Sequence, residues 1–195
     1  MPVRMAFRAL EQEGLLTRQG ARGYAVRQVT YKDLAGAVEV RGVLEGLAAR
    51  QAAELGISAE VREMLIQCLA EGDRLFAKGH VTEDDLAEYH DINKRFHQAI
   101  IEASGNPAIA GALMRNEHLP FASVSALAVD RNDLAREFRR FNFAHLQHHT
   151  VVDALLAGQG ARAEAIMREH ANATLGYARL FGGQDGAIAG LTILS

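Results

Sequence analysis

Residues 89–101 read Tyr89-His90-Asp91-Ile92-Asn93-Lys94-Arg95-Phe96-His97-Gln98-Ala99-Ile100-Ile101. At the period of an α-helix, Asn93, His97 and Ile100 fall on one face, and the charged residues fall away from it. An imidazole therefore lies in the middle of a stripe that should point toward a protein core. Asn93 precedes His97 by one turn, so both side chains can reach one point.

The same pattern recurs twice near the end of the chain. His148 is centred on a face that is built from Leu134, Phe138, Phe141, Val151, Val152 and Leu155. His170 is centred on a face that is built from Ala163, Ile166, Met167, Thr174, Tyr177 and Phe181. A single histidine on an apolar face is usually a hydrogen-bonded core residue. Three of them on separate helical stripes indicate a shared metal or ligand site.

The composition is that of a globular protein with one sizeable core. The chain has 195 residues, of which 49% are hydrophobic and 23% are charged. It has no long apolar run and no signal-peptide pattern, so we expect neither a membrane span nor secretion. The single cysteine, Cys68, excludes an internal disulfide framework and is typical of a reducing cytoplasm. We therefore expect a cytoplasmic location.

The charge is distributed unevenly along the chain. The net charge is −3, yet residues 1–28 carry five arginines against two glutamates. A small basic front on an acidic body suggests that only the front meets an anionic partner.

This basic front has the pattern of a helix followed by a hairpin. Residues 2–13 are predicted to be helical, and two short extended runs flank a glycine-bearing turn at residues 19–23. A helix and a basic hairpin are the back half of a winged helix-turn-helix. We expect residues 1–28 to be a partial unit of this kind, whose supporting helices should precede residue 1. On that expectation, this chain should bind DNA poorly.

The rest of the chain is predicted to be helical from Thr30 onward. The residue pairs Thr30 with Asp33 and Thr82 with Asp85 have the spacing of a capping box, and Ser58 is a further candidate N-cap. Glycine and proline provide the breaks between six helices, at residues 30–54, 58–78, 82–103, 107–118, 131–157 and 160–181. Residues 120–130 are either a short helix or a loop. We expect one helical domain at 29–181 and an irregular tail at 182–195.

Several segments, taken in order, resemble the GntR family of bacterial transcription regulators. Residues 2–16 resemble its recognition helix, and residues 18–26 resemble its wing. Residues 31–53 resemble the first helix of the ligand-binding (FCD) domain in the FadR-like branch. The most recognisable segment is Arg95-Phe96-His97-Gln98-Ala99-Ile100, followed by Ala103-Ser104-Gly105-Asn106-Pro107. Residues 148–158 and 165–170 resemble the last two helices of that domain.

The resemblance implies a mainly α fold: an antiparallel helical bundle of the FCD type, preceded by the partial winged helix-turn-helix. Many members hold a divalent metal with one Asp and three His. This implies that His97, His148 and His170 are ligands, and that Asn93 occupies the position of the Asp. An amide oxygen is a poorer ligand for a hard cation than a carboxylate. The ion would be Zn, Ni, Fe or Mn. The family spacing to His170 also favours His148 over His149.

Other residues have two possible interpretations. Arg41 and Glu45 are one helical turn apart, so they form either a simple ion pair or a site where Arg41 clamps an effector carboxylate. His145 and His90 lie on or near inward faces, where they could support the metal or line a cavity. Arg4 and Arg8, with Arg18 and Arg22 in the wing, are either solvated or in contact with DNA.

The preferred hypothesis is a ligand-responsive transcription regulator that binds operator DNA as a homodimer. Its helical domain would bind a divalent metal and a small carboxylate metabolite, because neutral imidazoles leave the charge of the ion uncompensated. One alternative is a metal-dependent hydrolytic enzyme, in which three His and a water form the site. Against it, no inward-facing Glu or Asp stands out near these histidines. The other alternative is a sensor for which the metal itself is the effector.

Overall fold

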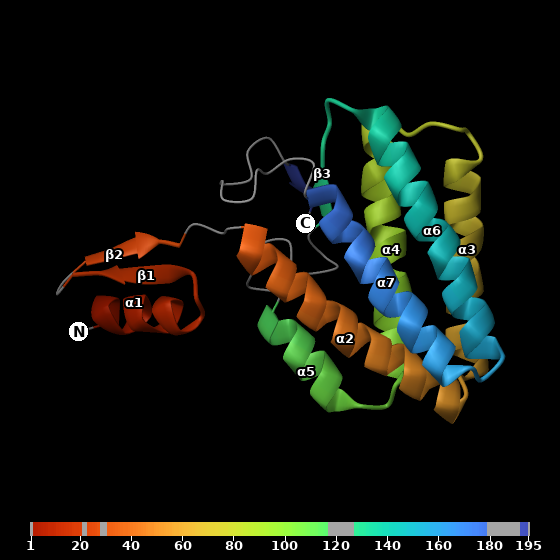
Figure 1. The fold of residues 1–195 in the computed structure, drawn as a ribbon, viewed down its shortest axis with the longest axis horizontal. Helices are drawn as coiled ribbons and strands as arrows, with labels where there is room; N and C mark the ends of the chain where they lie inside the picture. The colour runs from red at the N-terminus through yellow and green to blue at the C-terminus, as the bar shows by residue number, and fades with distance from the viewer. Residues whose placement is uncertain (1, 21–22, 28–30, 117–126, 179–191, 195) are drawn as a thin grey trace.

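The computed structural model describes residues 2–20, 23–27, 31–116, 127–178 and 192–194. Within them the chain forms a helical bundle that is preceded by a helix and a β-hairpin (Figure 1). The mainly helical class and the bundle architecture that the sequence predicts are therefore confirmed. Among these residues, no helix is both long enough and apolar enough to cross a membrane.

The first unit is α1 (Pro2–Gln12) followed by β1 (Leu16–Gln19) and β2 (Gly23–Val26). The two strands pair antiparallel, with Leu16 opposite Val26. Gly14 turns the chain between α1 and β1 at a φ of 75°, a left-handed conformation that suits glycine. Phe7 on α1 stacks on Tyr24 of β2 with ring centroids 5.2 Å apart, which fixes the helix on the hairpin.

The bundle contains six helices in the described part of the chain. They are α2 (Tyr31–Leu55), α3 (Ala59–Phe76), α4 (Glu83–Ala103), α5 (Pro107–Asn116), α6 (Leu134–Leu156) and α7 (Gly160–Ala178). Each begins and ends within three residues of its predicted bounds. The periodicity of the apolar residues and the positions of glycine and proline were therefore sufficient to define these helices.

Side-chain caps fix where several helices begin. The hydroxyl of Thr82 accepts from the backbone N–H of Asp85 at 3.3 Å, and the Asp85 carboxylate accepts from the N–H of Thr82 at 2.8 Å. This reciprocal pair is the predicted capping box. Ser58 caps α3 as expected, and Asp133 caps α6, which was not predicted. Thr30, the remaining candidate, lies outside the described residues.

The closest packing in the bundle is between α2 and α7, which lie side by side in Figure 1. Two glycines on α2 allow this approach. A Cβ atom on Gly42 would lie 3.0 Å from that of Ala171, and one on Gly46 would lie 2.8 Å from Cγ of Arg168. The adjoining face of α2 carries Ala48, Ala49 and Ala52, which are fully buried. Small side chains therefore bring the backbone of α2 close to its neighbours.

Apolar residues of α3, α4, α6 and α7 fill the centre of the bundle, and α4 contributes the most bulk. Its Phe96, Ile92 and Ile100 are almost fully buried. Burial of one such side chain contributes roughly 1.5–3 kcal/mol to the free energy of unfolding. The same face of α4 carries Asn93 and His97, so the core residues determine where these polar groups point.

The structure differs from the sequence expectation at β3 (Leu127–Val129) and β4 (Thr192–Leu194). These strands pair antiparallel, with Ala128 opposite Ile193. Residues 127–129 are thus neither helix nor loop, and residues 192–194 of the tail are not irregular. Residues 117–126, 182–191 and 195, on which the remaining expectations fall, lie outside the described residues.

Candidate metal and effector site

Three histidines from three helices meet inside the bundle. His97 comes from α4, His148 from α6 and His170 from α7, and all three are buried. One ring nitrogen from each lies within 4.8 Å of the others. The structure therefore brings together the three side chains that the sequence pattern proposed as ligands.

The spacing of the ring nitrogens fits a divalent transition metal. Nε2 of His148 lies 3.2 Å from Nε2 of His170. Two nitrogens bound tetrahedrally at about 2.0–2.1 Å from a zinc ion would be roughly 3.3 Å apart. Both ring nitrogens of His97 are buried, and neither has a hydrogen-bond partner within the described chain. A buried nitrogen without a partner costs free energy, which a bound cation would recover.

Glu45 on α2 lies directly beside this cluster. Its Oε2 atom is 3.1 Å from Nδ1 of His97, and its side chain is only 2% exposed. The sequence reasoning was wrong on this point, because it found no inward acidic residue near the histidines. Glu45 stands seven residues after buried Val38 and seven before buried Ala52. That helical spacing was the signal that could have placed it inside.

The charge of Glu45 is maintained by its neighbours. Burial raises the pKa of this carboxyl, but its interactions with His97 and Arg41 outweigh burial, and the pKa is lowered to about 2. An ionised Glu45 favours the His97 tautomer with its proton on Nδ1. The other nitrogen, Nε2, then keeps its lone pair for a ligand.

Gln147 performs a similar task for His170. Nδ1 of His170 lies 3.1 Å from Oε1 of Gln147, which can only accept a hydrogen bond. The Nδ1–H group of His170 therefore donates to Gln147, and Nε2 presents a lone pair toward His148. The sequence analysis did not identify Gln147, because a glutamine beside a histidine on one helix carries no distinctive pattern.

His148 and His170 are held in their neutral forms. Burial is the main cause that lowers the pKa of His148 well below its usual range, and the other histidines add to it. Burial likewise lowers the pKa of His170 to about 3. A neutral imidazole is the form that binds a metal, so these two rings are ready to act as ligands at neutral pH.

The aromatic core fixes the ring plane of His148. The Phe96 ring stacks on it with centroids 4.0 Å apart and an angle of 21° between the planes. Phe96 precedes His97 in sequence, and the rings of both residues lie against the His148 ring. The helix α4 therefore provides both the packing partner of His148 and another histidine of the cluster. A ligand ring that is packed in this way loses little further freedom when it binds a cation.

Asn93 and Arg41, the other proposed ligand and the proposed clamp, are both buried. Asn93 lies one turn before His97 on α4. Nε of Arg41 lies 3.6 Å from Oε1 of Glu45, so the two form an ion pair, which is one of the two interpretations that their spacing left open. Glu45 contacts both Arg41 and His97, so the charge of Arg41 lies close to the histidine cluster.

His145 and His90 do not join the three histidines. His145 is turned toward Asp73 on α3, with Nε2 3.0 Å from Oδ1. His90 lies on α4, where burial lowers its pKa, and its Nδ1 has no hydrogen-bond partner within the described chain. His149 is partly exposed and also contacts Asp73. Of the two adjacent histidines, His148 is therefore the one in the buried cluster.

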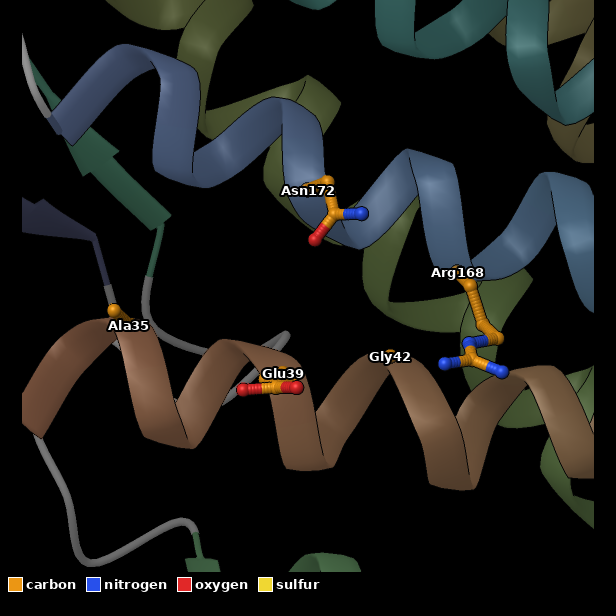
Figure 2. Close-up of a pocket in the computed structure, with 5 residues that line it drawn as sticks. All are labelled: Ala35, Glu39, Gly42, Arg168 and Asn172. Carbon is orange, nitrogen blue, oxygen red and sulfur yellow. The ribbon is translucent and has the colours of Figure 1, made fainter.

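A small cleft opens between α2 and α7. Figure 2 shows Asn172 and Arg168 on α7 facing Ala35, Glu39 and Gly42 on α2. Its volume is about 190 Å³. Cavities that hold drug-sized ligands usually measure about 300–1,000 Å³. This cleft is therefore large enough for only a few ligand atoms, and none of its lining residues belongs to the histidine cluster.

The candidate DNA-binding residues lie in the first unit. Arg4 and Arg8 on α1 and Arg18 on β1 are exposed, while Arg22 lies outside the described residues. The apolar face of α1 is also largely uncovered: Val3 is 65% exposed, and Phe7, one turn later, is 39% exposed. An uncovered apolar stripe on a short helix is typical of a helix that packs against another element.

Comparisons with known proteins agree with this architecture. The FCD domain family matches residues 37–173, which include α3 to α6 and most of α2 and α7. A probable D-xylose utilization operon transcriptional repressor of Paenarthrobacter nicotinovorans is 33% identical over 194 residues, covering 96% of this chain and 76% of the relative. The Glc operon transcriptional activator of Escherichia coli K12 is 30% identical over 133 residues, covering 68% of this chain and 50% of the relative.

A solved structure shares the fold. The E. coli protein McbR/YncC superposes with a TM-score of 0.59 at 18% identity, covering 90% of this chain and 78% of that one. The relatives described above are transcription regulators. This finding argues against the alternative hypothesis of a hydrolytic enzyme. The chain belongs to the FCD-domain family, in the FadR-like branch of the GntR transcription regulators, and is not an enzyme.

Proposed function

We propose that this regulator holds a divalent metal in its helical domain and responds to a small carboxylate that binds beside the ion. The observation that carries the proposal is the buried cluster of His97, His148 and His170, with one ring nitrogen from each within 4.8 Å of the others. Buried imidazoles rarely gather without a ligand, since each loses its water partners on burial.

His97, His148 and His170 would hold the ion, with Asn93 as a weak or water-mediated fourth partner. Imidazole ligands suit Zn, Ni or Fe, and Mn is possible at a site that also offers an amide oxygen. When bound, the ion supplies a fixed positive charge to which an anion can attach. Glu45 and Gln147 orient the two rings that they contact, and such partners raise the affinity of a metal site.

The charges around the cluster favour an anionic effector. Arg41 and Glu45 balance each other, and the histidines with lowered pKa are neutral. The charge of a bound ion is therefore not compensated by these groups. A carboxylate would neutralise part of it, and Arg41 could bind a second carboxylate oxygen. We expect an organic acid or a sugar acid.

The first unit would contact the operator. Arg4, Arg8 and Arg18 are exposed along α1 and β1, and Arg22, the fourth proposed contact, lies outside the described residues. Arginines at these positions could bind phosphates and base edges. In a homodimer, two such units would lie on the two half-sites of a palindrome. The effector would then act by preferring one relative arrangement of the two units.

A thermal-shift screen of metal-loaded protein tests the effector. The ligand panel contains organic and sugar acids, amines and neutral sugars, including D-xylose because of the operon for which the Paenarthrobacter relative is described. An acid at a hundredfold excess over its dissociation constant should add about 2.7 kcal/mol to the free energy of unfolding. The effect should disappear on chelation and weaken in Arg41→Ala.

Two outcomes would contradict the proposed effector. Hits confined to amines or neutral sugars would exclude a carboxylate. Acid hits that survive both chelation and Arg41→Ala would place the acid at another site. A change in DNA affinity produced by the metal alone, without any organic ligand, would instead support the metal sensor.

A further inference from the structure

A second group of metal-binding side chains lies at the surface between α3 and α6. Asp73 comes from α3, and His145 and His149 come from α6. Oδ1 of Asp73 lies 3.0 Å from Nε2 of His145 and 2.8 Å from Nε2 of His149. One ligand atom from each residue lies within 4.8 Å of the others. The function proposed above makes no use of this group.

The local structure fixes the His145 ring, and the helical spacing places His149 on the same side of α6. His145 and His149 are one helical turn apart, so their rings project from the same side of α6. The His145 ring lies against Gly72, where a Cβ atom would come within 2.2 Å of Cε1. It also packs on Phe76, with ring centroids 5.4 Å apart. Glycine at position 72 therefore makes room for the ring next to Asp73.

This group is separate from the three buried histidines. The ring centroids of His145 and His148 are 6.1 Å apart, and the two planes are nearly perpendicular. His148 faces His170, whereas His145 faces Asp73. The side chain of Asp73 is 56% exposed and that of His149 is 37% exposed, so this group is open to solvent. An ion could reach it without any opening of the bundle.

We propose that Asp73, His145 and His149 form a second metal site, specific for divalent transition ions such as zinc, cobalt and nickel. Two imidazoles and a carboxylate are a ligand set that zinc accepts, with the remaining position left to water. Calcium and magnesium prefer oxygen ligands and are disfavoured. The ion would bind Nε2 of both rings, so each neutral ring would carry its proton on Nδ1.

The distances require only a small adjustment. Tetrahedral ligands at about 2.0–2.1 Å from zinc are roughly 3.3 Å apart. The present contacts of 2.8 and 3.0 Å must therefore lengthen by a few tenths of an ångström. Asp73 can make this change because its side chain is half exposed. A bound ion would join α3 to α6 and stabilise the folded chain against unfolding.

Cobalt titration of the whole chain tests this site, with bound metal counted by elemental analysis and the coordination followed by visible absorption. The wild type should take up a second equivalent of Co²⁺ after the buried cluster is filled. His149→Ala and Asp73→Asn should each weaken only the second equivalent, by at least tenfold. His97→Ala should remove the first equivalent and keep the second. His80→Ala removes an exposed histidine and is the matched control.

Four outcomes of the titration support or contradict the second metal site. Loss of the second equivalent in both His149→Ala and Asp73→Asn, with the first retained, supports the site. A wild type that binds one equivalent, lost only in His97→Ala, leaves the buried site intact and overturns this inference. Retention of both equivalents in His149→Ala and Asp73→Asn overturns it as well. A response to Mg²⁺ equal to that for Co²⁺ would contradict the proposed specificity.

Discussion

The Oε2 atom of Glu45 lies 3.1 Å from Nδ1 of His97, although the two residues belong to different helices, α2 and α4. Both side chains are almost completely buried. The contact links the helix that packs most closely on α7 to the helix that carries the first histidine of the cluster. We therefore expect Glu45 to influence the orientation and the tautomer of His97.

Glu45→Gln should weaken metal binding with little change in the fold. Glutamine has nearly the same shape as glutamate but no charge. It therefore holds His97 less strongly than glutamate does in the tautomer that offers Nε2 to the metal. Loss of such a partner typically lowers metal affinity by about 10- to 100-fold. Competition with a chromogenic chelator measures the change. Glu39→Gln, on the exposed side of the same helix, should bind like the wild type. Equal affinities for the two variants would show that Glu45 does not support the site.

Asn93→Asp should raise the metal affinity. A carboxylate at this position adds a negative charge and a better oxygen ligand than an amide. The same competition assay measures the gain. Asn172→Asp, on the exposed face of α7, controls for the change in net charge. A gain of the same size in both variants, or no gain in either, would mean that Asn93 does not approach the ion.

Acid should destabilise the metal-free protein below about pH 6.5. The pKa of His170 is lowered from 6.5 to about 3 in the folded chain. Between these values the unfolded chain binds a proton that the folded chain does not. The free energy of unfolding therefore falls as the pH falls through this window. Each such histidine contributes a slope of about 1.4 kcal/mol per pH unit, and the pKa of His148 is lowered in the same direction.

Urea denaturation at about pH 7, 6 and 5 measures this slope. His170→Asn should make the slope shallower by up to about 1.4 kcal/mol per pH unit. His80→Asn removes an exposed histidine and should leave the slope unchanged. An identical slope in the wild type and His170→Asn would show that His170 is not held neutral by burial.

Gly72→Ala should destabilise the bundle. The new methyl group would lie 2.2 Å from Cε1 of His145, so the ring must move and lose its contact with Asp73. Overpacking of this kind costs about 1–3 kcal/mol, more than the roughly 1 kcal/mol that alanine gains over glycine in a helix. Gly36→Ala on α2 is the matched control, because nothing lies within 4 Å of its added methyl. The melting temperature of that variant should equal or exceed that of the wild type.

The helices and the inward histidines could be predicted from sequence because both follow from local spacing. Apolar residues repeat at the helical period around His97, His148 and His170, and Thr82 with Asp85 marks a helix start. The contacts that the supporting residues make with the histidines could not be found in this way. Glu45 looked like one half of an ion pair with Arg41, since nothing in the sequence indicates that α2 and α4 touch at this point.

The pairing of β3 with β4 illustrates the same limit. Ala128 and Ile193 are neighbours in the fold but are separated by the whole of α6 and α7 in the sequence. Three-residue strands contain too few positions for an alternating pattern to stand out. Gln147 and Asp73 were missed for a related reason: each acquires its role only from a histidine on another helix.

The most direct test of the metal centre is elemental analysis of protein that has been stripped, reloaded in parallel with Zn, Ni, Fe and Mn, and freed of weakly bound ions by gel filtration. His149→Ala, which lacks the second site, should retain about one ion per chain, and the double variant His97→Ala/His149→Ala should retain none. If none of the four metals remains on His149→Ala, or if the double variant retains as much as His149→Ala, the three histidines do not form a metal site.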